Sequence, residues 1–159
     1  MTLSIALGLL SGLMTASSAA PAESPQGAEQ CFDALVSARI VRQVPSVVPE
    51  PDSTDMIIMA WPYFIDLNVV RVLEGNAPTG RSTMLSVQHT FWRQGLGVRK
   101  WWLRRNTLGG FNILSEHDDQ QFARCAEDSP AADPYIIPGK GRTFQDLIAE
   151  GIERHGQRP

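Results

Sequence analysis

The chain has few of the residues from which metal sites and thiol chemistry are built. Its 159 residues include two cysteines and three histidines, with no Cys-x-x-Cys or His-x-x-x-His spacing for zinc. No Gly-x-Ser-x-Gly motif is present, which excludes an α/β-hydrolase nucleophile elbow. His117, beside Glu116, Asp118 and Asp119, could chelate a cation weakly or form a solvated loop. We therefore expect no metal site, no cofactor and no assignable catalytic residue.

Basic residues are outnumbered by acidic ones, 14 against 17, for a net charge of -3. Because phosphate contacts need a basic surface, this balance argues against a general nucleic-acid binder. The hydrophobic fraction of 43% and the charged fraction of 19% are typical of a globular domain. Eleven prolines and 13 glycines indicate many turns and little long helix. The length fits one domain.

The N-terminus has the pattern of an export signal. An apolar run over residues 3–14 is followed by small residues and Ala20-Pro-Ala22, and it is too short for a transmembrane helix, which needs ~20 apolar residues. No lysine or arginine precedes the run, so either the signal is weak or its true start lies upstream. The competing interpretation is a buried N-terminal helix. The pattern predicts a signal peptide over residues 1–22, export to the periplasm or outside, and no stable membrane span afterwards.

Export gives a role to the two cysteines, Cys31 and Cys125. In an oxidising compartment, one well-separated pair of cysteines is most simply a disulfide. A catalytic thiol or a metal site would instead need neighbouring cysteines or histidines, which neither residue has. We predict a Cys31–Cys125 disulfide.

Alternating apolar and polar residues predict five β-strands and a mainly β fold. In the third strand we expect Leu85 and Val87 to point inward. A C-terminal helix is expected after Thr143, an N-cap with Asp146 three residues later in a capping-box pattern. The expected strands span residues 34–44, 56–73, 83–89, 98–105 and 111–115. The expected organisation is a signal peptide over 1–22, a barrel domain over 23–125, a linker over 126–142 and a helix over 143–156.

The strand over 56–73 is the longest apolar stretch after the signal. Ile65, Leu67 and Val69 share one face. The pattern then slips by one residue, after which Val70 and Val72 carry the apolar face, as happens at a β-bulge. A long bent strand can serve both halves of a small barrel. The sequence therefore predicts a five-stranded OB-like barrel with a C-terminal α-helix.

Two stretches and one cysteine resemble a known family. Cys31-Phe-Asp-Ala-Leu-Val-Ser-Ala-Arg-Ile-Val41 is similar to the start of netrin-like (tissue-inhibitor-of-metalloprotease-like) domains, where a cysteine leads into the first barrel strand. Residues 65–75 resemble the second strand and following turn, and Cys125 has a counterpart paired to the first cysteine. The resemblance covers about residues 31–125 and implies an OB-type barrel. The Cys-x-Cys start that inhibits metalloproteases is missing here, so inhibition is not implied.

A basic, aromatic segment spans residues 89–105. It holds three of the four tryptophans and five basic residues, with no acidic residue. Because side chains alternate across a strand, Trp101 and Trp102 must point to opposite faces. We expect one to fill the barrel and the other to lie exposed among arginines, where it could stack on a ligand. The alternative is that the arginines only keep a core strand soluble. The candidate ligand-binding residues are Trp92, Arg93, Arg99, Trp101, Trp102, Arg104 and Arg105.

Three functions fit these patterns. The favoured one is an exported, non-catalytic binding or interaction module whose partner is an anionic envelope component or an acidic protein, not a nucleic acid. The second is a hydrolase with a carboxylate pair that the sequence does not locate. The third is a structural envelope protein without a small ligand. The sequence is silent on the identity of the ligand and on the oligomeric state.

Overall fold

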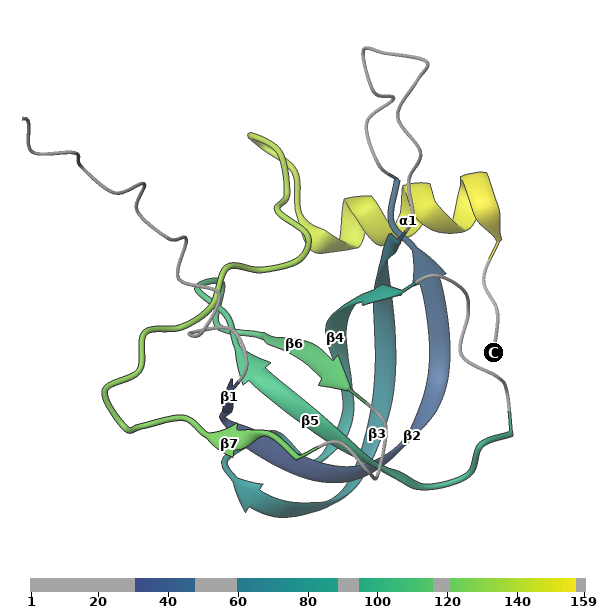
Figure 1. Ribbon diagram of the computed structural model, residues 1–159. Helices are drawn as coiled ribbons and strands as arrows, with labels where there is room; N and C mark the ends of the chain where they lie inside the picture. Colours follow the sequence, from purple (N-terminus) through teal and green to yellow (C-terminus); the bar gives the residue numbers. More distant parts are fainter. Residues whose placement is uncertain (1–30, 48–59, 89–94, 116–120, 157–159) are drawn as a thin grey trace, which may run out of the picture.

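The computed structural model describes residues 31–47, 60–88, 95–115 and 121–156, so the predicted signal peptide lies outside the described residues. Five strands close into a barrel in the order β2-β3-β4-β6-β5, and one helix lies across an end of it (Figure 1). Neighbouring barrel strands are antiparallel except β4 and β6, which are parallel. The predicted fold class, a mainly β, five-stranded OB-like barrel with a C-terminal helix, is confirmed. The elements are β1 (Cys31–Phe32), β2 (Ala34–Pro45), β3 (Trp61–Gly75), β4 (Gly80–Gln88), β5 (Arg99–Arg105), β6 (Phe111–Ser115), β7 (Ala123–Arg124) and α1 (Phe144–His155).

The long strand β3 carries the predicted bulge. Ile65, Leu67 and Val69 lie in the barrel core as expected. The pairing with β2 then skips one residue, since Ala38 faces Val69 and the preceding residue of β2 faces Arg71. The skipped Val70 is 59% exposed, whereas Val72 packs against the core. The slip and the inward Val72 are confirmed, but Val70 points outward because it is the extra residue of the bulge.

The prediction of which side chains of β4 point into the barrel is wrong. Met84 lies in the core of the barrel, and Leu85 packs outside it, under α1. Val87, expected inside, is 46% exposed. Ser86, which pairs with the core residue Tyr63, is buried on the inner face instead. The helix buries apolar residues on the outer face too, so alternation alone could not tell the two faces of β4 apart.

The helix α1 closes one end of the barrel and begins as predicted. The Thr143 side chain accepts a hydrogen bond from the Asp146 backbone N–H, and the Asp146 carboxylate accepts one from the Thr143 backbone N–H. Leu147 and Ile148 are buried against the barrel. Gly151 packs so closely on β2 that a Cβ atom there would clash with the carbonyl oxygen of Pro45. Among the described residues, no helix is long and apolar enough to cross a bilayer.

A strap, residues 121–137, contains β7 and runs along the outside of the barrel toward α1 (Figure 1). The predicted disulfide Cys31–Cys125 is present and ties the strap to β1, with which β7 forms a two-residue parallel pair. The Ala132 N–H donates to the Arg105 carbonyl, and the Asn112 side chain donates to the carbonyl of Asp133. Most of the expected linker over 126–142 is therefore docked on the barrel.

Candidate anion-binding face

Basic side chains from four strands gather on the outer surface of the barrel. Residues opposite each other on antiparallel strands point to the same face. One row runs from Lys100 of β5 through Ser37 of β2 to Arg71 of β3. The next row connects Arg39 of β2, through β3, to Arg81 of β4. The five cations of this surface, which we call the basic face, are Arg39, Arg42, Arg71, Arg81 and Lys100.

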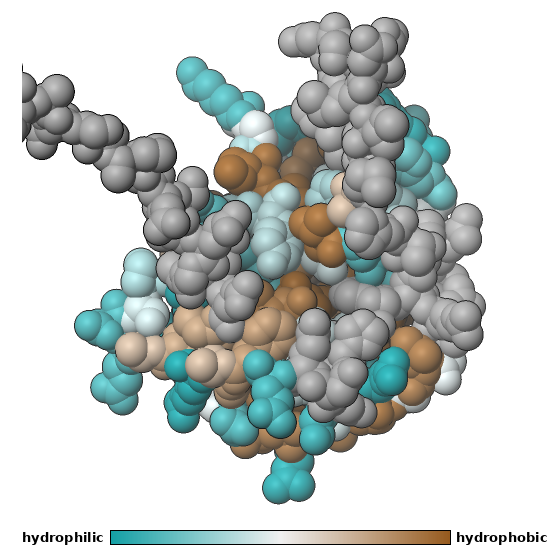
Figure 2. All heavy atoms as spheres, viewed as in Figure 1, coloured by the Kyte–Doolittle hydropathy of each residue, from teal (hydrophilic) through white to brown (hydrophobic). Residues whose placement is uncertain are grey.

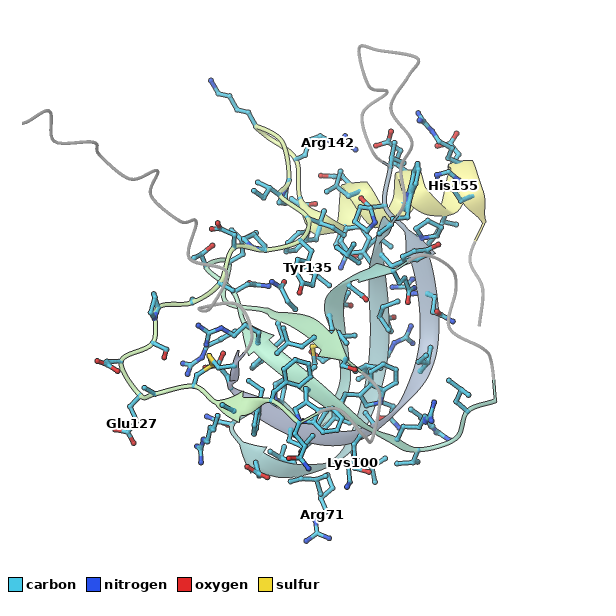
Figure 3. All side chains as sticks on the ribbon, viewed as in Figure 1. Arg71, Lys100, Glu127, Tyr135, Arg142 and His155 are labelled. Carbon is cyan, nitrogen blue, oxygen red and sulfur yellow. A yellow bond between two sulfur atoms is a disulfide. The ribbon has the colours of Figure 1, made fainter. Side chains whose placement is uncertain are left out.

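The basic face lies partly at the end of the barrel opposite the helix. Arg71 and Lys100 point away from α1, whereas His155 lies on the helix at the far end (Figure 3). Lys100 points outward because the next residue, Trp101, fills the core. Arg71, Lys100 and Arg39 are exposed. None of these three side chains is needed to fill the barrel, so they are available to a partner.

The third row of the basic face is built around one buried carboxylate. Arg42, Asp66 and Thr83 face each other across β2, β3 and β4. The Asp66 side chain is 3% exposed, and its Oδ2 lies 2.9 Å from Arg42 Nε and 2.7 Å from an Arg81 terminal nitrogen. The Thr83 hydroxyl donates to its Oδ1 at 2.7 Å. The carboxylate thus orients two cations of the face.

Two opposing effects act on the pKa of Asp66. Burial raises the pKa, because it penalises the charged form. Hydrogen bonds from Thr83 and Arg81, together with the charge of Arg42, lower the pKa, and together they outweigh the effect of burial. The pKa of Asp66 therefore lies below its ordinary value, and the group is a carboxylate at neutral pH.

The basic face stands on a chain that is acidic as a whole, with a net charge of -3. Asp66 is the one acidic residue within the three described rows, which hold five cations. Glu74, opposite Leu35, lies at their border. The positive charge of these rows is therefore a local feature of the barrel surface.

Both tryptophans of β5 are buried, so the expected exposed tryptophan is a wrong prediction. Trp101 and Trp102 do point to opposite faces: Trp101 fills the core and donates to the Ala38 carbonyl at 2.9 Å. Trp102 lies outside the barrel but is only 7% exposed. It packs with Phe32 of β1, and its ring lies 6.1 Å from that of Phe122 in the strap. The strap covers the surface that was expected to be open.

The arginines of residues 89–105 lie in different surroundings. The Arg104 side chain is 2% exposed and its Nη1 lies 2.7 Å from Asp33 Oδ2. Arg104 also donates to the Pro130 carbonyl, so it holds the strap. The side chain of Arg105 is 65% exposed and lies 3.7 Å from the same carboxylate. Arg99 pairs with Ala38, whose side chain lies in the core, and is half-buried at the barrel end.

Trp92 and Arg93 lie outside the described residues. The predicted group therefore does not form one described surface. Sequence reasoning missed the basic face because its members come from four separate strands. The available signal was the set of basic residues at outward positions of the predicted strands, such as Arg39 and Arg71, but their alignment required the strand register.

The described residues give little support to a metal site or to a catalytic pair of carboxylates. No group of three or more histidine, cysteine, aspartate and glutamate side chains could hold a metal ion there. The acidic loop with His117 lies outside the described residues. The two least exposed carboxylates, Asp33 and Asp66, lie in separate clusters and each is paired with two arginines. Within the part of the chain that the structure describes, these two carboxylates therefore do not pair with each other.

Comparison with known proteins does not assign the chain to a family: no family model, no curated protein and no solved structure matches it. The case for a function therefore depends on the geometry of the barrel surface.

Proposed function

We propose that the chain is an exported, non-catalytic binding module that engages a polyanionic partner through the basic face. The observation that carries the proposal is the register of β5, β2, β3 and β4, which aligns five cations in three rows around one buried carboxylate. The disulfide and the signal-like N-terminus support an extracytoplasmic location.

The shape of the face favours an extended partner over a single small anion. Its cations stand on the outside of a closed barrel and come from four different strands. Arg42 and Arg81 meet at Asp66, whereas Arg39, Arg71 and Lys100 have no such common partner among the described residues. Neighbouring strands are about 4.8 Å apart, so the two cations at the ends of the first row, and those at the ends of the second, lie two strand spacings, roughly 10 Å, apart at the backbone. Arginine supplies four of the five cations and suits carboxylate or phosphate groups through paired hydrogen bonds. A carboxylate-rich or phosphate-rich envelope polymer would match this surface.

The test measures binding of a defined polyanion, poly-L-glutamate, by isothermal titration calorimetry at low and high salt. One variant combines Arg39→Glu, Arg71→Glu and Lys100→Glu, none of which bonds to Asp66 in the structure. A matched control combines Arg124→Glu, Lys140→Glu and Arg154→Glu, three exposed residues outside the face. Both variants change the net charge equally, so only the position of the charge differs.

We expect the face variant to bind at least about tenfold more weakly than the control, since each lost contact is worth roughly 0.5–1 kcal/mol at the surface. Binding of the unaltered protein should weaken steeply as salt rises. Equal losses in the two variants, or no binding of the unaltered protein at low salt, would contradict the proposal. Circular dichroism of both variants checks that the barrel is intact.

A further inference from the structure

A cavity of about 380 Å³ lies where α1 meets the barrel, on the opposite side of the fold from the row of Arg71 and Lys100. Most of its lining comes from three parts of the chain: Ser46 and Val47 just after β2, Pro62 at the start of β3, and the last residues of the strap. Leu147 of α1 and Arg142 complete it. Ligand sites commonly have volumes of 300–1,000 Å³, with apolar walls and a few polar groups.

The walls of this cavity include apolar side chains that reach the surface. Ile137 is 70% exposed and Tyr135 is 38% exposed, although Ile136 between them is buried in the cluster under α1. Hydrophobic surface appears over the segment that precedes α1 (Figure 2). Exposed apolar surface beside a concavity is a common mark of a binding site. The apolar walls call for a hydrophobic ligand.

Among the described residues that line the cavity, the cation is Arg142. Figure 3 shows Tyr135 and Arg142 on the same stretch leading into α1. The Arg142 guanidinium pairs with the Glu150 carboxylate, which also lies 3.6 Å from an Arg154 terminal nitrogen. A guanidinium has five N–H donors, so the contact with Glu150 leaves others for an anion. The Glu150 carboxylate therefore competes with a bound anion for the Arg142 guanidinium.

We propose that this cavity binds a small apolar carboxylate, of the class of medium-chain fatty acids. The hydrocarbon lies against Ile137, Leu147 and Pro62, and the carboxylate meets Arg142. The site is independent of the basic face, because it shares no residue with it. It adds a small-molecule site to a barrel whose proposed partner is a polymer.

The test uses octanoate and its uncharged analogue 1-octanol as probes, with binding followed by amide and methyl chemical shifts in NMR titrations of the full chain. Octanoate should shift the signals of Ile137 and Leu147 selectively. Lengthening the probe from hexanoate to octanoate should tighten binding by roughly threefold to fourfold per added methylene if the chain is buried.

Two substitutions separate the charge contact from nonspecific adsorption. Arg142→Gln should weaken octanoate binding several-fold, and Glu150→Gln should strengthen it, because it removes the competing carboxylate. Neither change should alter the affinity for octanol. Ile137→Gln should weaken both probes, whereas Leu108→Gln, at a residue 49% exposed elsewhere, should leave both unchanged.

Three results would overturn the proposal. One is the absence of selective shifts at Ile137 and Leu147. Another is an octanoate affinity that Arg142→Gln and Glu150→Gln change in the same direction. The third is equal loss in the Ile137 and Leu108 variants, which would show adsorption to general apolar surface. None of these outcomes depends on polyanion binding at the basic face.

Discussion

The outer surface of the barrel carries two aspartate–arginine clusters with opposite designs. At Asp33 the cation is buried: the Arg104 side chain is 2% exposed and the Asp33 side chain 10%. At Asp66 the anion is buried, at 3% exposed, while its partners Arg42 and Arg81 are 25% and 59% exposed. Both clusters contain one carboxylate and two guanidinium groups, yet they differ in which charge faces water.

The difference separates a structural contact from a binding surface. Arg104 bonds to Asp33 and to the Pro130 carbonyl, and its Nη1 approaches the sulfur of Cys125. Asp33 lies just before β2, whereas Cys125 and Pro130 belong to the strap. Arg104 therefore joins the strap to the start of β2. At the basic face, by contrast, the buried Asp66 keeps two arginines oriented with their outer edges in solvent. An arginine count alone would treat the two clusters alike.

The comparison predicts its largest effect at Arg104. Arg104→Met should destabilise the protein by about 3–5 kcal/mol, because it removes one partner of a buried ion pair and releases the strap. Arg105→Met, which alters the exposed partner of the same carboxylate, should cost about 0–1 kcal/mol. Urea denaturation of both variants, with the disulfide intact, gives the two free energies of unfolding. Similar losses would show that Asp33 is not the centre of a buried cluster.

The pH dependence of stability should identify Asp66. Its folded pKa is lowered, so its contribution is fully present above the unfolded pKa, near 4, and is lost as pH falls through the folded value. Asp66→Asn should cost about 1–3 kcal/mol at pH 7 by weakening buried hydrogen bonds to arginine. The gap in Tm between the two proteins should close as the pH drops below about 4.

Asp33→Asn provides the reference for that measurement, since it alters the other cluster in the same chemical way. A Tm gap for Asp66→Asn that stays constant from pH 7 to pH 2 would show that the carboxylate charge is not what stabilises the third row. A gap that widens in acid would contradict the sign of the lowered pKa.

Local sequence patterns were enough to predict the strands of the barrel, but not which side chains are exposed on its surface. The strands and the capping box of Thr143 and Asp146 are encoded within a few residues, so alternation and helix-start signals predicted them. β1 and β7 contain two residues each and pair across a long sequence separation, which no short-range pattern indicates. The covering of Trp102 by Phe122 depends on that pairing. The exposed-tryptophan hypothesis therefore failed on a long-range contact.

The basic face also depends on long-range contacts, but here these contacts create an exposed surface that the sequence did not predict. The positive charges of residues 89–105 are close together in sequence, yet the fold sends Arg104 and Lys100 to different surfaces. Arg39, Arg71 and Arg81 are isolated in the sequence and become neighbours only through strand register. The bulge at Val70 matters here, because without the extra residue Arg71 would point to the other face.

Arg81→Gln should have a small effect on stability but should weaken polyanion binding, which tests the difference between the two clusters directly. Asp66 keeps Arg42 at 2.9 Å and the Thr83 hydroxyl at 2.7 Å when Arg81 is lost, so unfolding should change by about 0–1 kcal/mol. Binding of poly-L-glutamate should nevertheless weaken by about two- to fivefold, since one cation of the face is gone. Arg105→Gln is the matched control, as it removes the exposed arginine of the other cluster. If Arg105→Gln weakens polyanion binding as much as Arg81→Gln, the two clusters do not differ in function. If only Arg81→Gln does so, the open side of the Asp66 cluster is the side that meets the partner.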